Sequence, residues 1–331
     1  MTPRYGLSIA AVIAVALFPL LGGGLGTFLA TDVAIWALFA VSLNILVGYT
    51  GLVSFGHAAY FGVGAYTAGI LLKSGGVPFI LALPLAGLAA GLLAVIFGFF
   101  CVRLTKVYFS MLTLAFAQIA WALCFKLNWV TGGDQGLSGI PYPAFLHHLN
   151  NVPVLGTLDL SQRFHIVVVV VVGICLAVIH RILQSPFGRV LTMIRENPGR
   201  AEFVGVNVHR YQLAAFAIAG VAGSLFGIFN RGMYPDLMYW TKSAEVLIMV
   251  VLGGMGRFYG PIIGAFLLLW LNQELTAITE YWSAIVGLAL MALIFFLPGG
   301  FADLIERGRG YLASKLRCGK FARTPAQEGT R

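Results

Sequence analysis

Charged side chains are scarce in this sequence. Asp, Glu, Lys and Arg make up 10% of its 331 residues, against about 25% in ordinary soluble domains, while 59% of the residues are hydrophobic and the mean hydropathy is +0.90. A soluble globule of this length could not cover its surface with so few polar groups. A disordered chain is excluded as well, because such chains are poor in apolar residues. The composition therefore indicates a polytopic membrane protein.

Cysteines are few and the common catalytic motifs are missing. The four cysteines do not suit a disulfide scaffold or a metal site, and we interpret them as small packing residues: Cys101, Cys124, Cys175 and Cys318. There is no phosphate-binding loop, because the only Gly-Lys pair, at 319–320, is followed by Phe321. Zinc-protease and nucleophile-elbow motifs are absent, and no apolar run holds two acidic residues. We expect no enzymatic activity, no catalytic residue, no metal and no cofactor in this chain.

Long apolar runs dominate what is present. A spanning helix needs about 20 mainly apolar residues. Ten runs approach this length and predict an all-α membrane protein, with eight to eleven spans possible: 7–21, 32–47, 53–72, 79–100, 107–126, 164–183, 211–229, 244–256, 260–278 and 282–298. The Gly-rich run 53–72 and the short run 244–256 leave open whether each is continuous, broken or re-entrant. No small-residue cleavage site follows 7–21, so we expect an uncleaved helix there rather than a signal peptide.

The net charge of +9 is carried mostly between the apolar runs and in the tail. With the N-terminus inside, sixteen of the 21 Lys and Arg residues fall on the inner side, which places both termini in the cytoplasm. We expect one transmembrane domain over 1–306, with an extracytoplasmic loop at 127–163 and a cytoplasmic segment at 184–210. A basic cytoplasmic tail follows at 307–331. No nucleic-acid-binding pattern accompanies the charge, so the lipid bilayer, and no nucleic acid, is the expected contact.

Polar side chains within the apolar runs are the first candidates for function, because they are costly in a membrane. We expect a translocation path to be lined by four of them: Asn44, Ser54, His57 and Gln118. The alternative is that His57 is a hydrogen-bonded packing residue, and that Asn44 and Gln118 join neighbouring helices at about 1 kcal/mol each. A single histidine is not a proton relay.

Glycine-rich motifs recur along the chain. The stretch 48–66 contains Gly56 and Gly62, which predict either close helix packing or a broken helix that lines a path. The stretch 253–265 predicts a turn between two helices, at which Arg257 would cap the cytoplasmic side. Its packing and turn residues are Gly253, Gly254, Gly256, Gly260, Pro261 and Gly264. A third Gly-rich stretch, 131–141, reads as an extracytoplasmic loop.

The cytoplasmic segment holds the sharpest local signal. Asn197 precedes Pro198, the arrangement of a helix cap followed by a first-turn proline, and Gly205 would end the short helix. We expect residues 201–204 to form this short helix. An amphipathic helix of this kind suits docking into a groove of a partner protein. The alternative is a helix that lies on the lipid surface.

Four motifs in this order, at 48–58, 131–141, 195–205 and 253–265, resemble the LivM-type permease subunits of ABC importers for branched-chain amino acids. The resemblance extends from about residue 44 to residue 301. Met255 and Gly299 depart from the residues most frequent in that family, and both lie outside the cytoplasmic segment.

The resemblance implies a set of partners and roles. Such a permease would pair with a second, homologous permease subunit and two cytoplasmic ATPases, which use the ATP, in a bacterial inner membrane. An extracytoplasmic binding protein would deliver the solute. The segment at 195–205 would couple the permease to the ATPases through Arg195, Glu196, Asn197, Ala201 and Gly205.

The expected function is inward transport of leucine, isoleucine and valine. A zwitterion needs no fixed counter-charge in the membrane, which agrees with the scarcity of charges in the apolar runs. Urea, short amides or other amino-acid-like solutes are the alternative cargoes of such a permease. An ion-coupled secondary transporter is a more distant alternative, because it would need carboxylates or a charge relay within the spans.

Overall fold

The computed structural model describes residues 24–73, 75–104, 106–137, 139–140, 159–224, 232–278, 281–296 and 299–303. The predicted span 7–21, most of the predicted extracytoplasmic loop and the basic tail 307–331 lie outside the described residues. Cys318 lies there as well.

The described part of the chain is helical and contains no strand. Its elements are α2 (Gly24–Asn44), the π-helix η2 (Ile45–Thr50), α3 (His57–Lys73), α4 (Phe79–Cys101), α5 (Lys106–Lys126), α6 (Asn128–Thr131), η3 (Gly133–Gln135), α8 (Leu160–Gln184), α9 (Pro186–Glu196), α10 (Pro198–Phe203), α11 (Val208–Ser224), η5 (Pro235–Met238), α13 (Trp240–Gly253), α14 (Gly260–Ile278) and α15 (Trp282–Phe296). An isolated bridge joins Leu137 to Met233.

Each predicted span from 32–47 onward overlaps a helix in its described residues. By length and composition, four helical stretches are long and apolar enough to cross a membrane: Gly26–Thr50, Phe79–Cys101, Val107–Lys126 and Leu160–Gln184. For the remaining predicted spans, membrane crossing stays a prediction, and so does the total number of spans. The run 244–256 is a short helix, α13, that begins at Trp240 and ends at Gly253.

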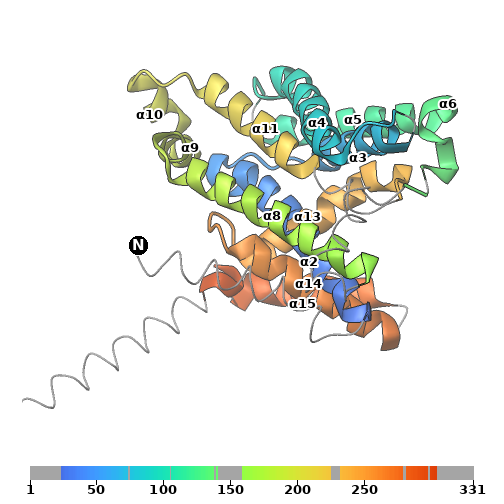
Figure 1. Ribbon diagram of the computed structural model, residues 1–331. Helices are drawn as coiled ribbons and strands as arrows, with labels where there is room; N and C mark the ends of the chain where they lie inside the picture. Colours follow the sequence, from blue (N-terminus) through green and yellow to red (C-terminus); the bar gives the residue numbers. More distant parts are fainter. Residues whose placement is uncertain are drawn as a thin grey trace, which may run out of the picture.

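Helix α2 forms the centre of the bundle. It packs against α8, α11, α13 and α14, and the side chains of residues 35–47 are almost completely buried. In Figure 1, α2 runs between an upper layer formed by α3, α4, α5 and α11 and a lower layer formed by α14 and α15. A helix enclosed in this way is apolar on all sides, which explains why its sequence shows no amphipathic period.

Helix α4 shows how the outer helices pack. Its buried face is a row of small residues at every fourth position, Ala82, Ala86, Ala90 and Ala94, and it packs against α3 and α11. The opposite face exposes leucine side chains, among them Leu88 and Leu92. Small residues inside and large apolar residues outside are the pattern of a helix whose outer face meets lipid, because burial of alanine allows close backbone contact.

The Gly-rich run 53–72 is broken at its start. Residues 51–56 are not helical, and α3 begins only at His57. Hydroxyl groups of α5 and α13 bond the backbone here: Ser110 Oγ donates to the Val53 carbonyl (2.7 Å), Phe55 N–H donates to Thr113 Oγ1 (3.3 Å) and Ala58 N–H donates to Ser243 Oγ (2.9 Å). Non-helical backbone is tolerated at membrane depth only where protein groups satisfy it, and this segment meets that condition.

Gly56 is the position at which the break depends most on the absence of a side chain. A Cβ atom there would collide with the backbone carbonyl of Thr113. We expect Gly56→Ala to lower the apparent melting temperature of the detergent-solubilised protein, because overpacking costs about 1–3 kcal/mol.

Gly287→Ala is the matched control for this substitution. A Cβ atom at Gly287 meets nothing within 4 Å, so the control should melt like the unsubstituted protein. Equal melting temperatures for the Gly56 and Gly287 variants would contradict the close contact with α5.

Candidate functional site

The side chain of Asn44 joins two of the glycine motifs. It lies at the end of α2, is almost completely buried, and reaches the turn between α13 and α14. Its Nδ2 atom donates to the Arg257 carbonyl (3.0 Å), and its Oδ1 atom accepts from Gly256 N–H (3.2 Å). Both polar atoms of the amide are therefore used to hold a turn that is 212 residues away in the chain.

Two glycines allow this close approach. A Cβ atom at Gly48 would collide with the Asn44 side chain and lie 2.6 Å from the Gly256 nitrogen. Gly256 has φ +80°, in the left-handed region that other residues rarely adopt. The chain turns between the end of α13 at Gly253 and the start of α14 at Gly260, within the stretch 253–265, and this turn meets the 48–58 motif directly.

The other glycines of this turn bring α13 and α14 together. A Cβ atom at Gly264 would lie 2.9 Å from the Gly253 nitrogen, and one at Gly260 would lie 3.0 Å from the Gly253 carbonyl oxygen. Gly254 approaches Gly299, and Pro261 is at the start of α14. Gly62, on α3, similarly leaves room for the Met238 side chain.

Arg195 connects the predicted coupling segment to these motifs. It lies in the last turn of α9, and its Nη1 atom donates to the Gly48 carbonyl. Gly48 is near the end of the π-helix, where carbonyl groups lack a helical partner and a cation is favourable. We call the cluster of Asn44, Gly48, Arg195, Gly256 and Arg257 the glycine junction.

The glycine junction continues to the C-terminal end of the described chain. Arg257 Nη2 forms an ion pair with Asp303 Oδ1 at 2.8 Å. The side chain of Arg257 therefore holds the segment after α15, while its carbonyl accepts the bond from Asn44. A local capping role of Arg257 at the turn stays a prediction, and the ion pair adds a longer-range contact.

The coupling segment forms two short helices, α9 and α10. Asn197 caps α10, because its Oδ1 atom accepts from Arg200 N–H (3.1 Å), and Pro198 occupies the first turn. The helix runs from Pro198 to Phe203, so it includes residues 201–203 of the predicted 201–204, and Val204 follows its last residue. Gly205 follows it with φ +86°, which turns the chain toward α11.

The residues of this segment face in different directions. Ala201 is fully buried against Ile194 and Val208, so it shapes the segment from within, while Glu196 and Asn197 are exposed. Two apolar side chains are almost fully open: Phe203 is 94% exposed and Val204 is 76% exposed. In Figure 1, α10 projects at the upper left, beyond the ends of α8 and α11.

The four residues expected to line a path lie in different surroundings. His57 and Ser54 are fully buried, Asn44 belongs to the glycine junction, and Gln118 is half-buried on α5. Ser54 Oγ accepts from Gly56 N–H (3.3 Å). A role in a path stays a prediction for each of them.

His57 is enclosed by aromatic rings. Its ring stacks on Phe39 at a centroid distance of 5.3 Å and meets the edge of Tyr60 at 5.9 Å. Ser42 Oγ donates to the Phe39 carbonyl (2.7 Å), so the His57 Nε2–H donates to Ser42 Oγ (2.8 Å). This is the arrangement of a hydrogen-bonded packing histidine, the alternative that the sequence left open.

Sequence reasoning missed several residues of the site. Ser42 bonds His57, Asp303 pairs with Arg257, and Phe203 is the most exposed large side chain on α10. Ser42 had a detectable signal, because it is a polar residue two positions before Asn44 within an apolar run. The pairing of Asp303 with Arg257 joins segments 46 residues apart, and the exposure of Phe203 depends on how α10 packs on its neighbours.

Comparisons with known proteins agree with this architecture. A family model described as branched-chain amino acid transport system / permease component matches residues 26–295. The high-affinity branched-chain amino acid transport system permease proteins LivM of Escherichia coli (strain K12) and Salmonella typhimurium (strain LT2) are each 31% identical, over 82% and 87% of this chain and 68% and 72% of their own. The autoinducer 2 import system permease protein LsrD of Enterobacter sp. (strain 638) is 25% identical over 81% of this chain and 82% of its own. No solved structure matches the chain significantly.

The helical bundle and these matches define a multi-pass membrane protein that is a transport component rather than an enzyme. The chain belongs to the family of permease components of branched-chain amino acid transport systems. Within that family it is similar to the LivM type.

The glycine junction generates a prediction about stability. Asn44→Leu keeps the size of the side chain and removes both hydrogen bonds, which leaves Gly256 N–H and the Arg257 carbonyl without this partner. Each such buried group costs about 1–3 kcal/mol, so we expect the apparent melting temperature to fall by several degrees.

Asn272→Leu is the control, because among the described residues the Asn272 side chain accepts only a local bond, from Thr276 on the same helix. It should change the melting temperature little. If both variants melted alike, the junction would not contribute the stability that its contacts indicate.

Proposed function

We propose that this chain is a transmembrane permease subunit of an ATP-driven importer that moves leucine, isoleucine and valine into a bacterial cell. The observation that carries the proposal is the family match over residues 26–295, together with the two LivM relatives. The match to an autoinducer 2 permease makes another small polar solute the alternative cargo.

The proposal includes partners and a topology. A second homologous permease would sit beside this chain, two ATPases would bind on the cytoplasmic side, and a binding protein would deliver the solute outside. The chain itself would hold no cofactor, since the ATPases use the ATP. We propose ten spans in the inner membrane, both termini in the cytoplasm, one domain over 1–306 and a basic tail over 307–331.

Exposed apolar residues on α10 support a protein contact there. Phe203 and Val204 project from a segment whose neighbours are charged, namely Glu196, Arg200 and Glu202. An exposed aromatic residue at the tip of a short helix fits a hydrophobic groove of a partner, and aromatic residues often supply most of the binding energy of such contacts. We propose that the side chains of Phe203 and Val204 bind in a hydrophobic groove of the ATPase.

A chain of contacts connects that pair to the centre of the bundle. Ala201 packs on Ile194, which fixes α10 against α9, and Arg195 at the end of α9 bonds the Gly48 carbonyl. Gly48 belongs to the π-helix that continues α2. Movement of an ATPase against α10 would therefore reach α2 through the glycine junction.

The cargo can be tested by uptake. Cells that lack this chain should lose uptake of radiolabelled leucine and regain it when the chain is restored. Unlabelled isoleucine and valine should compete, whereas urea and short amides should not. Unchanged leucine uptake would overturn the assignment of the cargo and leave the permease architecture in place.

The ATPase contact can be tested by co-purification. Phe203→Ser should reduce the amount of ATPase that purifies with the permease by at least about tenfold, because loss of an aromatic anchor typically costs 2 kcal/mol or more. Transport should fall in parallel while the permease stays in the membrane.

Trp129→Ser is the control for that experiment. Trp129 is also highly exposed, at 86%, but it lies on α6, on the predicted extracytoplasmic side. This variant should keep the ATPase. Normal co-purification of the Phe203 variant would show that α10 lies on lipid instead.

A further inference from the structure

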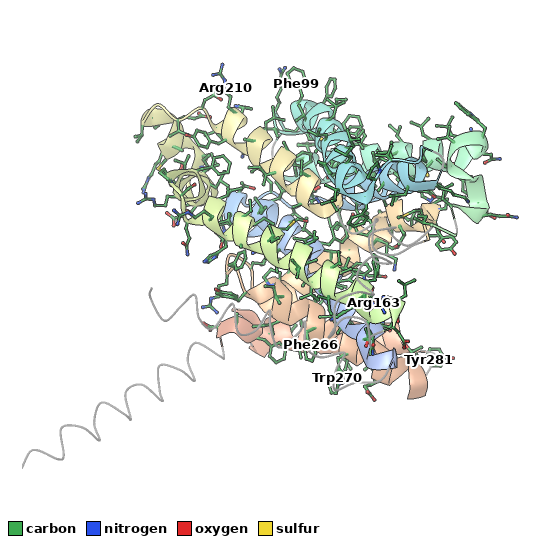
Figure 2. The ribbon with its side chains drawn as sticks, in the orientation of Figure 1. Phe99, Arg163, Arg210, Phe266, Trp270 and Tyr281 are labelled. Atoms are coloured by element: carbon green, nitrogen blue, oxygen red, sulfur yellow. The ribbon has the colours of Figure 1, made fainter. Side chains whose placement is uncertain are left out.

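A hollow of about 650 Å³ lies between the end of α4 and the start of α11. Figure 2 shows Phe99 and Arg210 at the same edge of the bundle, one from each helix. The lining combines apolar residues with basic and polar ones: Gly98, Phe99, Val102, Leu213, Arg103, Asn207, His209 and Arg210. None of the residues that line the hollow belongs to the glycine junction.

The charged side chains that line this hollow are all positive. Arg103 and Arg210 carry positive charge, His209 and Asn207 add polar groups, and none of the lining residues is acidic. The Arg103 guanidinium lies over the Phe99 ring, 4.3 Å from its centroid. This cation–π contact holds the charge at the end of the apolar surface, with its remaining N–H groups available to an anion.

An exposed apolar track leads into the hollow along α4. Leu85, Leu88, Leu92, Ile96 and Phe99 follow one another at intervals of three or four residues, and each is at least 44% exposed. Residues at this spacing share one face of a helix. The track therefore runs along α4 and ends beside Arg103, four residues after Phe99.

We propose that the hollow binds the phosphate headgroup of an anionic phospholipid, with one acyl chain of the lipid lying along the α4 track. Basic pockets between transmembrane helices on the cytoplasmic side are suited to such headgroups. A free anion would use only the basic residues of the hollow and not its apolar ones. A protein partner that contacts the charges would not require an apolar track that continues along the spanning part of α4.

This site is independent of the cargo of the permease. It depends on α4 and α11 crossing the membrane with Arg103 and Arg210 in the same leaflet. The leucine-uptake experiment therefore does not test whether the hollow binds lipid, whatever its result. The lipid site is tested by measuring bound lipid directly.

The test uses the purified full-length chain in detergent and native mass spectrometry. Phosphatidylglycerol should remain bound where phosphatidylcholine does not, and it should raise the apparent melting temperature. Arg103→Gln with Arg210→Gln should weaken retention of phosphatidylglycerol by at least about tenfold, because two charges near the headgroup are lost. Arg103→Lys with Arg210→Lys should keep most of the binding.

Arg189→Gln with Arg200→Gln is the matched control, because it removes the same charge from α9 and α10. Equal losses in the control and the test variant would overturn the site and show a general charge effect. Displacement of the lipid by inorganic phosphate would show a free-anion site instead. Equal retention of phosphatidylglycerol and phosphatidylcholine would also overturn the proposal. Unchanged retention of phosphatidylglycerol after Arg103→Gln with Arg210→Gln would overturn it too.

Discussion

Backbone amide groups within a membrane must find their partners inside the protein, because no water is available to them. The structure meets this constraint at the non-helical residues 51–56 by placing Ser110, Thr113 and Ser243 around the break. The helices that carry these hydroxyl groups, α5 and α13, cannot shift far without leaving polar groups unbonded. The arrangement of α2, α3, α5 and α13 thus follows from the satisfaction of one non-helical segment.

Small residues determine how closely the helices approach. The alanine row on α4 and the glycines of the α13–α14 turn replace the large side chains that would fill a soluble core. Hydrophobic burial gives little advantage between helices in lipid, so close packing and hydrogen bonds provide the specificity. Asn44 and Arg195 supply such bonds at the point where the glycine motifs meet, which fixes the predicted coupling segment to α2.

Apolar length and the Asn-Pro and Gly-Pro patterns are local signals, and they predicted the positions of the helices, the cap at Asn197 and the turn after Gly253. The sequence also indicated that 253–265 and 195–205 matter, but it could not show that both contact Gly48, because those contacts join segments about 150 and 210 residues apart. The sequence also did not show which side chains of α10 are exposed to solvent. Ala201 and Phe203 are two residues apart on α10, yet one is buried and the other is open.

The break at 51–56 has a consequence for dynamics. Amide hydrogens in a regular helix are protected from exchange by bonds within the same helix, but those of Phe55 and Ala58 are protected by side chains of α5 and α13. Their exchange rates therefore depend on the separation between helices rather than on local unfolding. The exchange rates of these two amides should therefore rise in any state of the transport cycle in which α5 or α13 moves away from α3.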